Sequence, residues 1–507
     1  MKQAFYSTLA MLLAACAVTE RGEIRVYSEN RWYWEYNGEP VLLLGGSYED
    51  NMFQFPNWYY GHNKEGLSAG MTDWTLEQHL DALVDAGGNY IRGSLSCRNY
   101  GNRFPYLKIN GIPGDNYNET DIYDLNQWDP EWENRLDTFL RLCHERGIIV
   151  SIELFDRFDL FLAEADADAP GSRGSKNTGW LHHPWNPDRN INYTEETSGL
   201  PGGSIDYMGY DHELYYCVPG PVNSGKSPEP IVLETLQKYV DKVLSYTFQY
   251  DNIIYIIENE TYQPLDFGNY WIDYINQKAA GANKSVFVTN MVGQPDPDHE
   301  RQQFIRRDPM FKYYDYSQNN HNTGQTHYDN ILMVKDDIAG TQNGIKPVNF
   351  VKIYGSAQYG SIQDAKERFW RGIFAGIASA RFHRPGYNSY YWGLGLNEDA
   401  RSQIKSVRLL TDKLDIFRCE PDNSLLGSRS DNEAYCLAEA DQQYAVYFTD
   451  GGAVTLDLNG TSGEFLMQWL DIDRSQWDNA ITISSGGSLT LTAPSHGQWV
   501  VLITKSQ

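Results

Sequence analysis

The chain has few cysteines and lacks the common metal-binding motifs. It holds 6 cysteines in 507 residues, and no two of them have the C-x-x-C spacing of a structural zinc site. Its 11 histidines form no H-x-H or H-E-x-x-H pattern. The acidic stretch EADADA (164–169) lacks the glycine and the closing glutamate of a calcium loop. We therefore expect no metal centre and no cofactor. Cys419 and Cys436 flank one short segment and form the pair that an oxidising environment would bridge.

Positive charge is scarce as well. The 41 lysines and arginines stand against 67 aspartates and glutamates, which gives a net charge of -26. A surface of this kind repels phosphate backbones and anionic lipid headgroups, so we expect no nucleic-acid partner. The composition leaves the oligomeric state open.

Long hydrophobic runs are absent, and only the first residues are suited to a membrane. After residue 16 no stretch approaches the roughly 18 apolar residues of a spanning helix. The opening MKQAFYSTLAMLLAAC has a basic start, an apolar run and small residues before Cys16, like a secretory signal. Its end resembles the bacterial lipobox, which implies cleavage before Cys16 and acylation of that cysteine. We expect residues 1–16 to be a lipoprotein signal and the protein to be lipid-anchored in a bacterial cell envelope; the alternative is a buried N-terminal helix.

Strand-like runs and amphipathic helices alternate along residues 24–418. Eight such units predict a parallel sheet closed into a (β/α)8 TIM barrel, an α/β fold. The alternative, an open doubly wound sheet, calls for a G-x-G-x-x-G turn that is absent. Residues 420–507 show short alternating strands, which predict a small C-terminal β-sandwich domain. The eight runs are 41–46, 89–96, 148–156, 252–260, 285–291, 313–320, 347–355 and 379–386.

A long segment, about residues 155–228, follows the third run and is rich in Trp, Tyr, Asn, Gly and Pro. Loops of this position lie on the catalytic face of a barrel, and so long a loop is usually functional. Trp180, Trp185 and Tyr193 are predicted to offer flat faces on which sugar rings stack. The alternative is that these aromatic residues pack within the loop itself.

Polar side chains end each of the eight runs. In a barrel these ends meet on one face, where catalytic groups lie. Alternation along a strand puts Glu258 and Glu260 on one side and Asn259 on the other, unless the strand ends between them. The side chains at these ends are Glu49, Asp50, Arg92, Arg98, Glu153, Asp156, Arg157, Asp159, Glu258, Asn259, Glu260, Asn290, Gln318, Asn319, Asn320, His321, Lys352, Tyr354, Arg381, His383 and Arg384.

The ending Asn259-Glu260, with this order of strands and helices, resembles a large clan of (β/α)8 retaining glycoside hydrolases. The resemblance implies that Glu260 is the catalytic acid/base. The motifs IELFDRFD, SQNNHN, VKIYG, RFHRP and YFTDGG resemble more specifically a group of bacterial envelope proteins described as cellulase-like, with a tail named as collagen-binding. The likeness covers nearly all of residues 24–507. Nothing in the tail itself supports collagen binding, and we expect it to pack against the barrel.

The seventh run departs from the clan, whose members carry a nucleophilic glutamate there. It reads KPVNFVK, with Lys352 where the acid is expected. A glycosidase needs a second carboxylate, about 5–5.5 Å from the acid for retention or about 6.5–9.5 Å for inversion. Glu153 or Asp156 is the predicted partner and Glu258 the next candidate, whereas Asp315 is less favoured because it begins its strand.

Charge around Glu260 is expected to decide its role. Neighbouring carboxylates would raise its pKa and suit it to donate a proton, while Lys352 would keep the partner acid ionised. Arg92 is expected to organise the ring by hydrogen-bonding carboxylates. The last run carries three cations that either hold an anionic sugar or neutralise the ring, namely Arg381, His383 and Arg384.

Together these patterns predict a glycoside hydrolase that cleaves a poly- or oligosaccharide, with Glu260 and either Glu153 or Asp156 as its catalytic residues. One alternative is a non-catalytic glycan-binding lipoprotein. Another is a lyase acting on uronic acids, with Lys352, Tyr354 or His383 as base. The predicted substrate contacts are Asn259, Glu258, Arg92, Arg157, Trp180, Trp185, Asn290, Asn319, His321, Lys352, Tyr354, Arg381 and His383.

Overall fold

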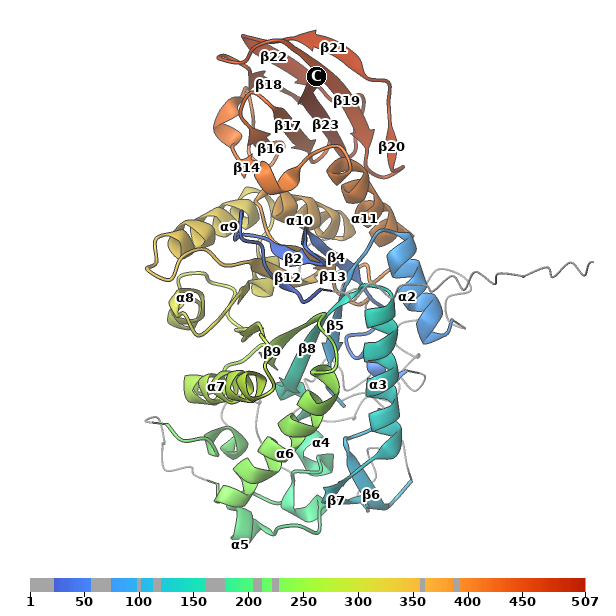
Figure 1. Cartoon of the computed structure of the whole chain (residues 1–507), viewed down its shortest axis with the longest axis vertical. Helices are drawn as coiled ribbons and strands as arrows, with labels where there is room; N and C mark the ends of the chain where they lie inside the picture. Colours follow the sequence, from blue (N-terminus) through green and yellow to red (C-terminus); the bar gives the residue numbers. More distant parts are fainter. Residues whose placement is uncertain are drawn as a thin grey trace, which may run out of the picture.

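A computed structural model shows a helix-wrapped barrel with a β-sandwich at one end (Figure 1). It describes residues 22–55, 74–97, 102–112, 120–160, 178–203, 212–220, 228–355, 361–385 and 393–506. The predicted lipid-attachment residue Cys16, Arg98 and the EADADA stretch lie outside these ranges. Of the helices within them, none combines the length and the hydrophobicity that a bilayer crossing requires.

Eight parallel strands form the barrel, in the order β10-β9-β8-β5-β4-β13-β12-β11. The Lys312 N–H donates to the Val288 carbonyl at 3.2 Å, which joins the two ends of this order. The predicted (β/α)8 barrel is therefore confirmed. Its strands are β4 (Leu43–Gly46), β5 (Tyr90–Ser94), β8 (Ile149–Asp156), β9 (Ile253–Asn259), β10 (Val288–Thr289), β11 (Tyr314–Asp315), β12 (Val348–Ile353) and β13 (Ser379–Phe382).

Helices follow the strands, and several begin at side chains that cap them. Thr75 and Gln78 form a capping box at the first helix, and Asp129 accepts two backbone N–H bonds at the next. The weakly patterned stretch at 299–311 forms a shorter helix than predicted. The helices are α2 (Leu76–Asp85), α3 (Pro130–Glu145), α6 (Pro230–Thr247), α7 (Leu265–Gly281), α8 (Glu300–Arg307), α9 (Gly324–Ala339), α10 (Ile362–Phe374) and α11 (Glu398–Thr411).

A small antiparallel sheet seals the amino end of the barrel. It consists of β1 (Arg25–Val26), β2 (Trp34–Tyr36) and β3 (Glu39–Val41). Trp34 is fully buried among inward-facing barrel residues, and its indole N–H donates to Asn349 Oδ1 at 3.0 Å. The polar ring lies at the opposite, carboxyl end of the barrel, which this sheet does not cover.

Two insertions extend the barrel at that end. The first, which the sequence analysis missed, is a hairpin of β6 (Tyr106–Asn110) and β7 (Ile122–Trp128). The second is the long segment after β8, and a bridge between Tyr123 and Asn190 joins it to the hairpin. The short helices of the second insertion are η4 (Arg157–Asp159), α4 (Thr178–His182), η6 (Pro187–Arg189), α5 (Glu195–Ser198) and η7 (Glu213–Tyr216).

The C-terminal strands form two antiparallel sheets, as the predicted sandwich requires. They pack onto the barrel through α10 and α11 (Figure 1), where the rings of Trp370 and Tyr447 stack at 5.6 Å. Cys419 and Cys436 are free, so the disulfide considered from the sequence does not form. The strands are β14 (Glu420–Pro421), β15 (Leu426–Gly427), β16 (Ala434–Glu439), β17 (Gln443–Phe448), β18 (Ala453–Asp457), β19 (Glu464–Asp471), β20 (Gln476–Trp477), β21 (Ile481–Ser484), β22 (Ser488–Thr492) and β23 (Trp499–Lys505).

Candidate active site at the carboxyl end of the barrel

Glu260 directly follows the last residue of β9 in a left-handed backbone conformation. Its φ of 52° is uncommon for a residue other than glycine and is typical of functional sites that tolerate strain. The turn brings Glu260 and Asn259 to the same partner, Lys352, whereas Glu258 leaves the ring. The strand thus ends between the two glutamates, and they do not share a side.

Three side chains hold the Glu260 carboxylate. Lys352, on β12, places Nζ 2.5 Å from Oε1 and donates to Asn259 Oδ1 at 2.7 Å. Arg157 Nη2 lies 3.3 Å from Oε2, and the Tyr354 hydroxyl donates to Oε1 at 3.4 Å. The Lys352 side chain is 2% exposed and that of Glu260 17%. The carboxylate is therefore the open end of an otherwise buried charge network.

This network keeps Glu260 ionised. Burial alone would raise the pKa of Glu260, but the charges of Lys352 and Arg157 outweigh it and hold the pKa well below its ordinary value. The predicted rise in the pKa of Glu260 is therefore wrong. The contacts with Lys352 and Arg157 outweigh burial and any neighbouring negative charge.

The Glu153 carboxylate forms an ion pair with the Arg92 guanidinium. The guanidinium donates to both carboxylate oxygens, with Nη2 at 2.7 Å from Oε1 and 2.6 Å from Oε2. The Ser94 hydroxyl adds a bond to Oε1 at 2.8 Å. Burial raises the pKa of Glu153, and Arg92 opposes that rise. Because the Glu153 side chain is 0% exposed, it is placed to support the ring rather than to touch a sugar.

The Asp50 carboxylate lies among the basic side chains at the end of the last barrel strand. Burial would raise the pKa of Asp50, but the surrounding cations outweigh it and hold the pKa well below the ordinary range. This arrangement favours the ring-neutralising interpretation of the last-strand cations over an anionic-sugar pocket. The nitrogen-to-oxygen distances to Asp50 are 2.9 Å for Arg92, 3.3 Å for Arg381, 3.2 Å for Arg384 and 3.5 Å for His383.

Asp156 lies closest to Glu260 along the hydrogen-bond network. Its Oδ1 accepts from Asn259 Nδ2 at 3.0 Å and from the Phe158 backbone N–H at 3.1 Å. Asn259 in turn accepts from Lys352, which contacts Glu260. A single amide and a single ammonium therefore connect the two carboxylates.

Glu258 is fully buried outside this network. Neither of its carboxylate oxygens has a hydrogen-bond partner in the described chain, although the hydroxyls of Thr261 and Tyr215 lie near enough to lower its pKa slightly. Burial dominates and raises the pKa of Glu258 to about 7. Asp315, the last residue of β11 rather than its first, is also buried, and its pKa is raised to about 6 by burial.

The aromatic residues predicted as sugar platforms are core residues. Trp180 is 0% exposed and its indole donates to the Pro201 carbonyl at 2.8 Å. Trp185 is buried and donates to the Tyr106 hydroxyl at 2.7 Å, while the Tyr193 hydroxyl donates to the Trp185 carbonyl at 2.8 Å. The stacking prediction is wrong for all three: Trp180 and Tyr193 pack within the second insertion, as the alternative interpretation expected, and Trp185 packs between the two insertions.

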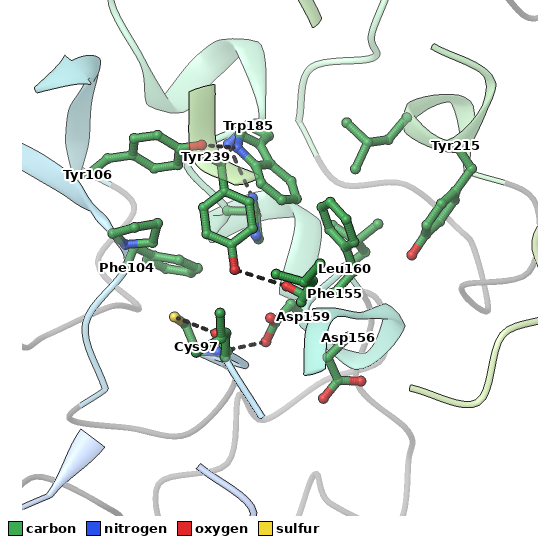
Figure 2. Close-up of a pocket in the computed structure, with 15 residues that line it drawn as sticks. Cys97, Phe104, Tyr106, Phe155, Asp156, Asp159, Leu160, Trp185, Tyr215 and Tyr239 are labelled. Atoms are coloured by element: carbon green, nitrogen blue, oxygen red, sulfur yellow. Dashed lines mark hydrogen bonds between the residues drawn. The ribbon is translucent and has the colours of Figure 1, made fainter. Parts of the chain in front are cut away.

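Figure 2 shows the small cavity behind these aromatic residues, with Asp156 at its edge. Its volume of about 30 Å³ holds one or two water molecules at most. Tyr239 and Trp185 fill the space around it. The cavity is thus a packing feature next to the ring and is too small for a sugar.

Two more residues that were predicted to contact the substrate, Asn290 and Asn319, instead make hydrogen bonds within the protein. Asn290 accepts the backbone N–H of Glu258 at 3.1 Å, and Asn319 donates to the His327 carbonyl at 2.8 Å. His321 ends η8 (Ser317–His321) at the rim, close enough to Glu260 for their charges to interact. The sequence analysis missed Ser94, although it lies two residues beyond Arg92 on one strand and so on the same face. Among the residues that the structure describes, no cluster of His, Cys, Asp and Glu side chains could hold a metal ion.

Comparisons with known proteins identify the fold. No protein-family model matches the chain, and no curated protein matches it. A glycoside hydrolase family 5 structure from Bacteroides vulgatus matches 96% of this chain and 94% of its own, with TM-score 0.57 and 16% identity. A structure titled glycoside hydrolase matches 96% and 97%, with TM-score 0.59 and 15% identity. An α-amylase from Geobacillus thermoleovorans, complexed with acarbose, matches 92% and 99%, with TM-score 0.53 and 13% identity.

These structures share the overall fold of this chain over nearly its whole length. At such identities the likeness extends to the fold alone. The chemistry of this chain therefore rests on the geometry of its own ring.

Replacing Lys352 with methionine tests the central ion pair. Removing one partner of a buried pair leaves an uncompensated charge, so we expect Lys352→Met to lower the free energy of unfolding by about 3–5 kcal/mol at pH 7. The control Arg141→Met breaks an exposed pair with Glu145 and should cost at most about 1 kcal/mol. Urea denaturation measures both, and equal small losses would contradict the network described.

Replacing Glu258 with glutamine tests its buried, proton-binding state. Because the pKa of Glu258 is raised from 4.5 to about 7, the folded chain binds this proton more tightly than the unfolded chain. Its contribution to stability is then present at low pH and is lost as the pH rises through about 7. Between pH 5 and pH 8 the variant should gain about 2–3 kcal/mol on the wild type in urea denaturation. Parallel pH profiles for the two proteins would refute the assignment.

Proposed function

We propose that the protein is a glycosidase in which Glu260 acts as an ionised carboxylate. The supporting observation is the triple hold on Glu260 by Lys352, Arg157 and Tyr354 at the open end of the ring. A carboxylate whose pKa is kept low is suited to attack an anomeric carbon or to activate a water molecule. This role reverses the acid/base role that the resemblance implies for Glu260.

In this proposal Asp156 is the second carboxyl group and delivers the proton to the leaving oxygen. It is linked to Glu260 through Asn259 and Lys352, and it lies at the end of the neighbouring strand β8. Glu153 is the weaker candidate because Arg92 and Ser94 occupy it. The substrate is a poly- or oligosaccharide that reaches the barrel from its carboxyl end.

A glycan-binding protein without hydrolytic activity is the second candidate. One observation favours it: Lys352 stands in strand seven and neutralises Glu260 directly. The lyase alternative has less support, because Lys352 is bound to Glu260 and Asn259, and His383 faces Asp50.

Two variants separate hydrolysis from binding. Glu260→Gln and Asp156→Asn should each lower the release of reducing ends from a panel of neutral and acidic glycans by about 10²–10⁴-fold, while calorimetric binding of the same glycan persists. Glu464→Gln, an exposed site on β19 of the sandwich, is the matched control and should keep full activity. If the wild type binds a glycan but releases no reducing ends from it, the binding protein is the correct function.

We also propose that the mature protein is anchored to a bacterial membrane through acylated Cys16, on the strength of the Leu-Ala-Ala-Cys motif. Cys16→Ser removes the acceptor sulfur, so the variant expressed in a bacterium should move from the membrane fraction to the soluble fraction. Recovery of wild type and variant in the same fraction would exclude the anchor.

A further inference from the structure

A second cavity lies at the junction of the barrel and the sandwich, away from the carboxylate ring. It has a volume of about 330 Å³, within the range of small-ligand sites, which often form between domains. Three separate elements form its wall: the end of α2, one face of α11 and the turn between β19 and β20. Its lining residues are Ala82, Asp85, Ala86, Arg401, Ser402, Lys405, Arg474 and Ser475.

Cationic side chains dominate this lining. Arg401, Lys405 and Arg474 face one carboxylate, that of Asp85. Arg474 also pairs with Asp471 at 3.2 Å. In a chain with a net charge of -26, such a local excess of positive charge would attract an anion.

Within the described ranges the Arg401 side chain makes no hydrogen bond or ion pair. Its Nε is buried without a hydrogen bond. Every other arginine in the described ranges makes a side-chain hydrogen bond or an ion pair. Lys405, one helical turn further along α11, has no ion pair within the same ranges. A buried donor left unpaired is costly, and a guanidinium binds carboxylate and sulfate oxygens in pairs.

Hydroxyl groups beside these cations join α11 to the turn between β19 and β20. Ser402 Oγ donates to the Asp473 carbonyl at 2.7 Å, and Ser406 Oγ donates to Ser475 Oγ at 2.9 Å. Ser475 Oγ donates to the Ser402 carbonyl at 3.1 Å. The cavity is therefore preformed by contacts between α11 and the sandwich, so little ordering is needed when a ligand binds.

We propose that this cavity binds an oxyanion group, such as the sulfate or carboxylate of an acidic monosaccharide unit. Arg401 and Lys405 hold the anion, with Arg474 at the rim. Asp85 provides an acceptor for a ligand hydroxyl. The site is independent of the carboxylate ring and gives the C-terminal domain a share in ligand binding.

Isothermal titration calorimetry at constant ionic strength tests the site. The probes are glucose 6-sulfate, glucuronate, inorganic sulfate and glucose, titrated into the full chain. We expect saturable binding of the acidic sugars and no binding of glucose. The double variant Arg401→Gln/Lys405→Gln should weaken that binding at least tenfold, and Arg141→Gln, an exposed arginine on α3, should leave it unchanged.

The single variant Lys405→Gln controls for a folding defect in the double variant, because this side chain is exposed and its replacement should leave the fold intact. It should weaken binding about threefold. Inorganic sulfate binding as tightly as the sulfated sugar would support an oxyanion site that reads the anion alone; tighter binding of the sugar would support a sugar site. Absence of saturable binding, or binding that neither variant weakens, would overturn the proposal.

Discussion

The structure of the site depends on one ion pair, between Lys352 of β12 and Glu260 after β9. A lysine that is 2% exposed is costly to bury unless its charge is met, and Glu260 and Asn259 meet it together. The positive φ of Glu260 is the backbone condition for this contact. The pair therefore requires both the backbone conformation at the end of β9 and the position of Lys352, and it keeps Glu260 ionised.

Two charge clusters share the carboxyl end of the barrel, and they have different exposure. The cluster around Asp50, Arg92 and Glu153 is enclosed, since the side chains of this trio are at most 4% exposed. The cluster around Glu260 is open, at 17% exposure. The enclosed cluster fixes the strand ends, and only the open one is placed to meet a substrate. Candidate residues of the same chemical type thus differ in their exposure to solvent.

The order of strands and helices was readable from the sequence because apolar spacing reports which face of each element is buried. The side-chain contacts within the site were harder to predict from the sequence. Alternation failed at Glu260 because a left-handed residue breaks the strand, and nothing in its side chain signals that conformation. Trp180 and Trp185 failed as platforms because composition does not tell an aromatic ring on a surface from one buried within or between insertions. The β6–β7 hairpin escaped notice because its register shifts twice, which spoils a two-residue pattern.

The departure at strand seven limits what the fold can say about the reaction. A barrel of this type accommodates many chemistries, and a likeness at 13–16% identity extends to the scaffold and not to the reactive groups. The resemblance noted from the sequence implies a carboxylate where this chain has Lys352, and Lys352 instead pairs with Glu260 and keeps it ionised. In the proposed glycosidase the proton for the leaving oxygen must come from a group other than Glu260, and the proposal assigns it to Asp156, which is joined to Glu260 through Asn259 and Lys352. Because Glu260 is ionised in both proposed functions, a proton donor within reach of the glycosidic oxygen is what would separate a glycosidase from a barrel that only binds sugar.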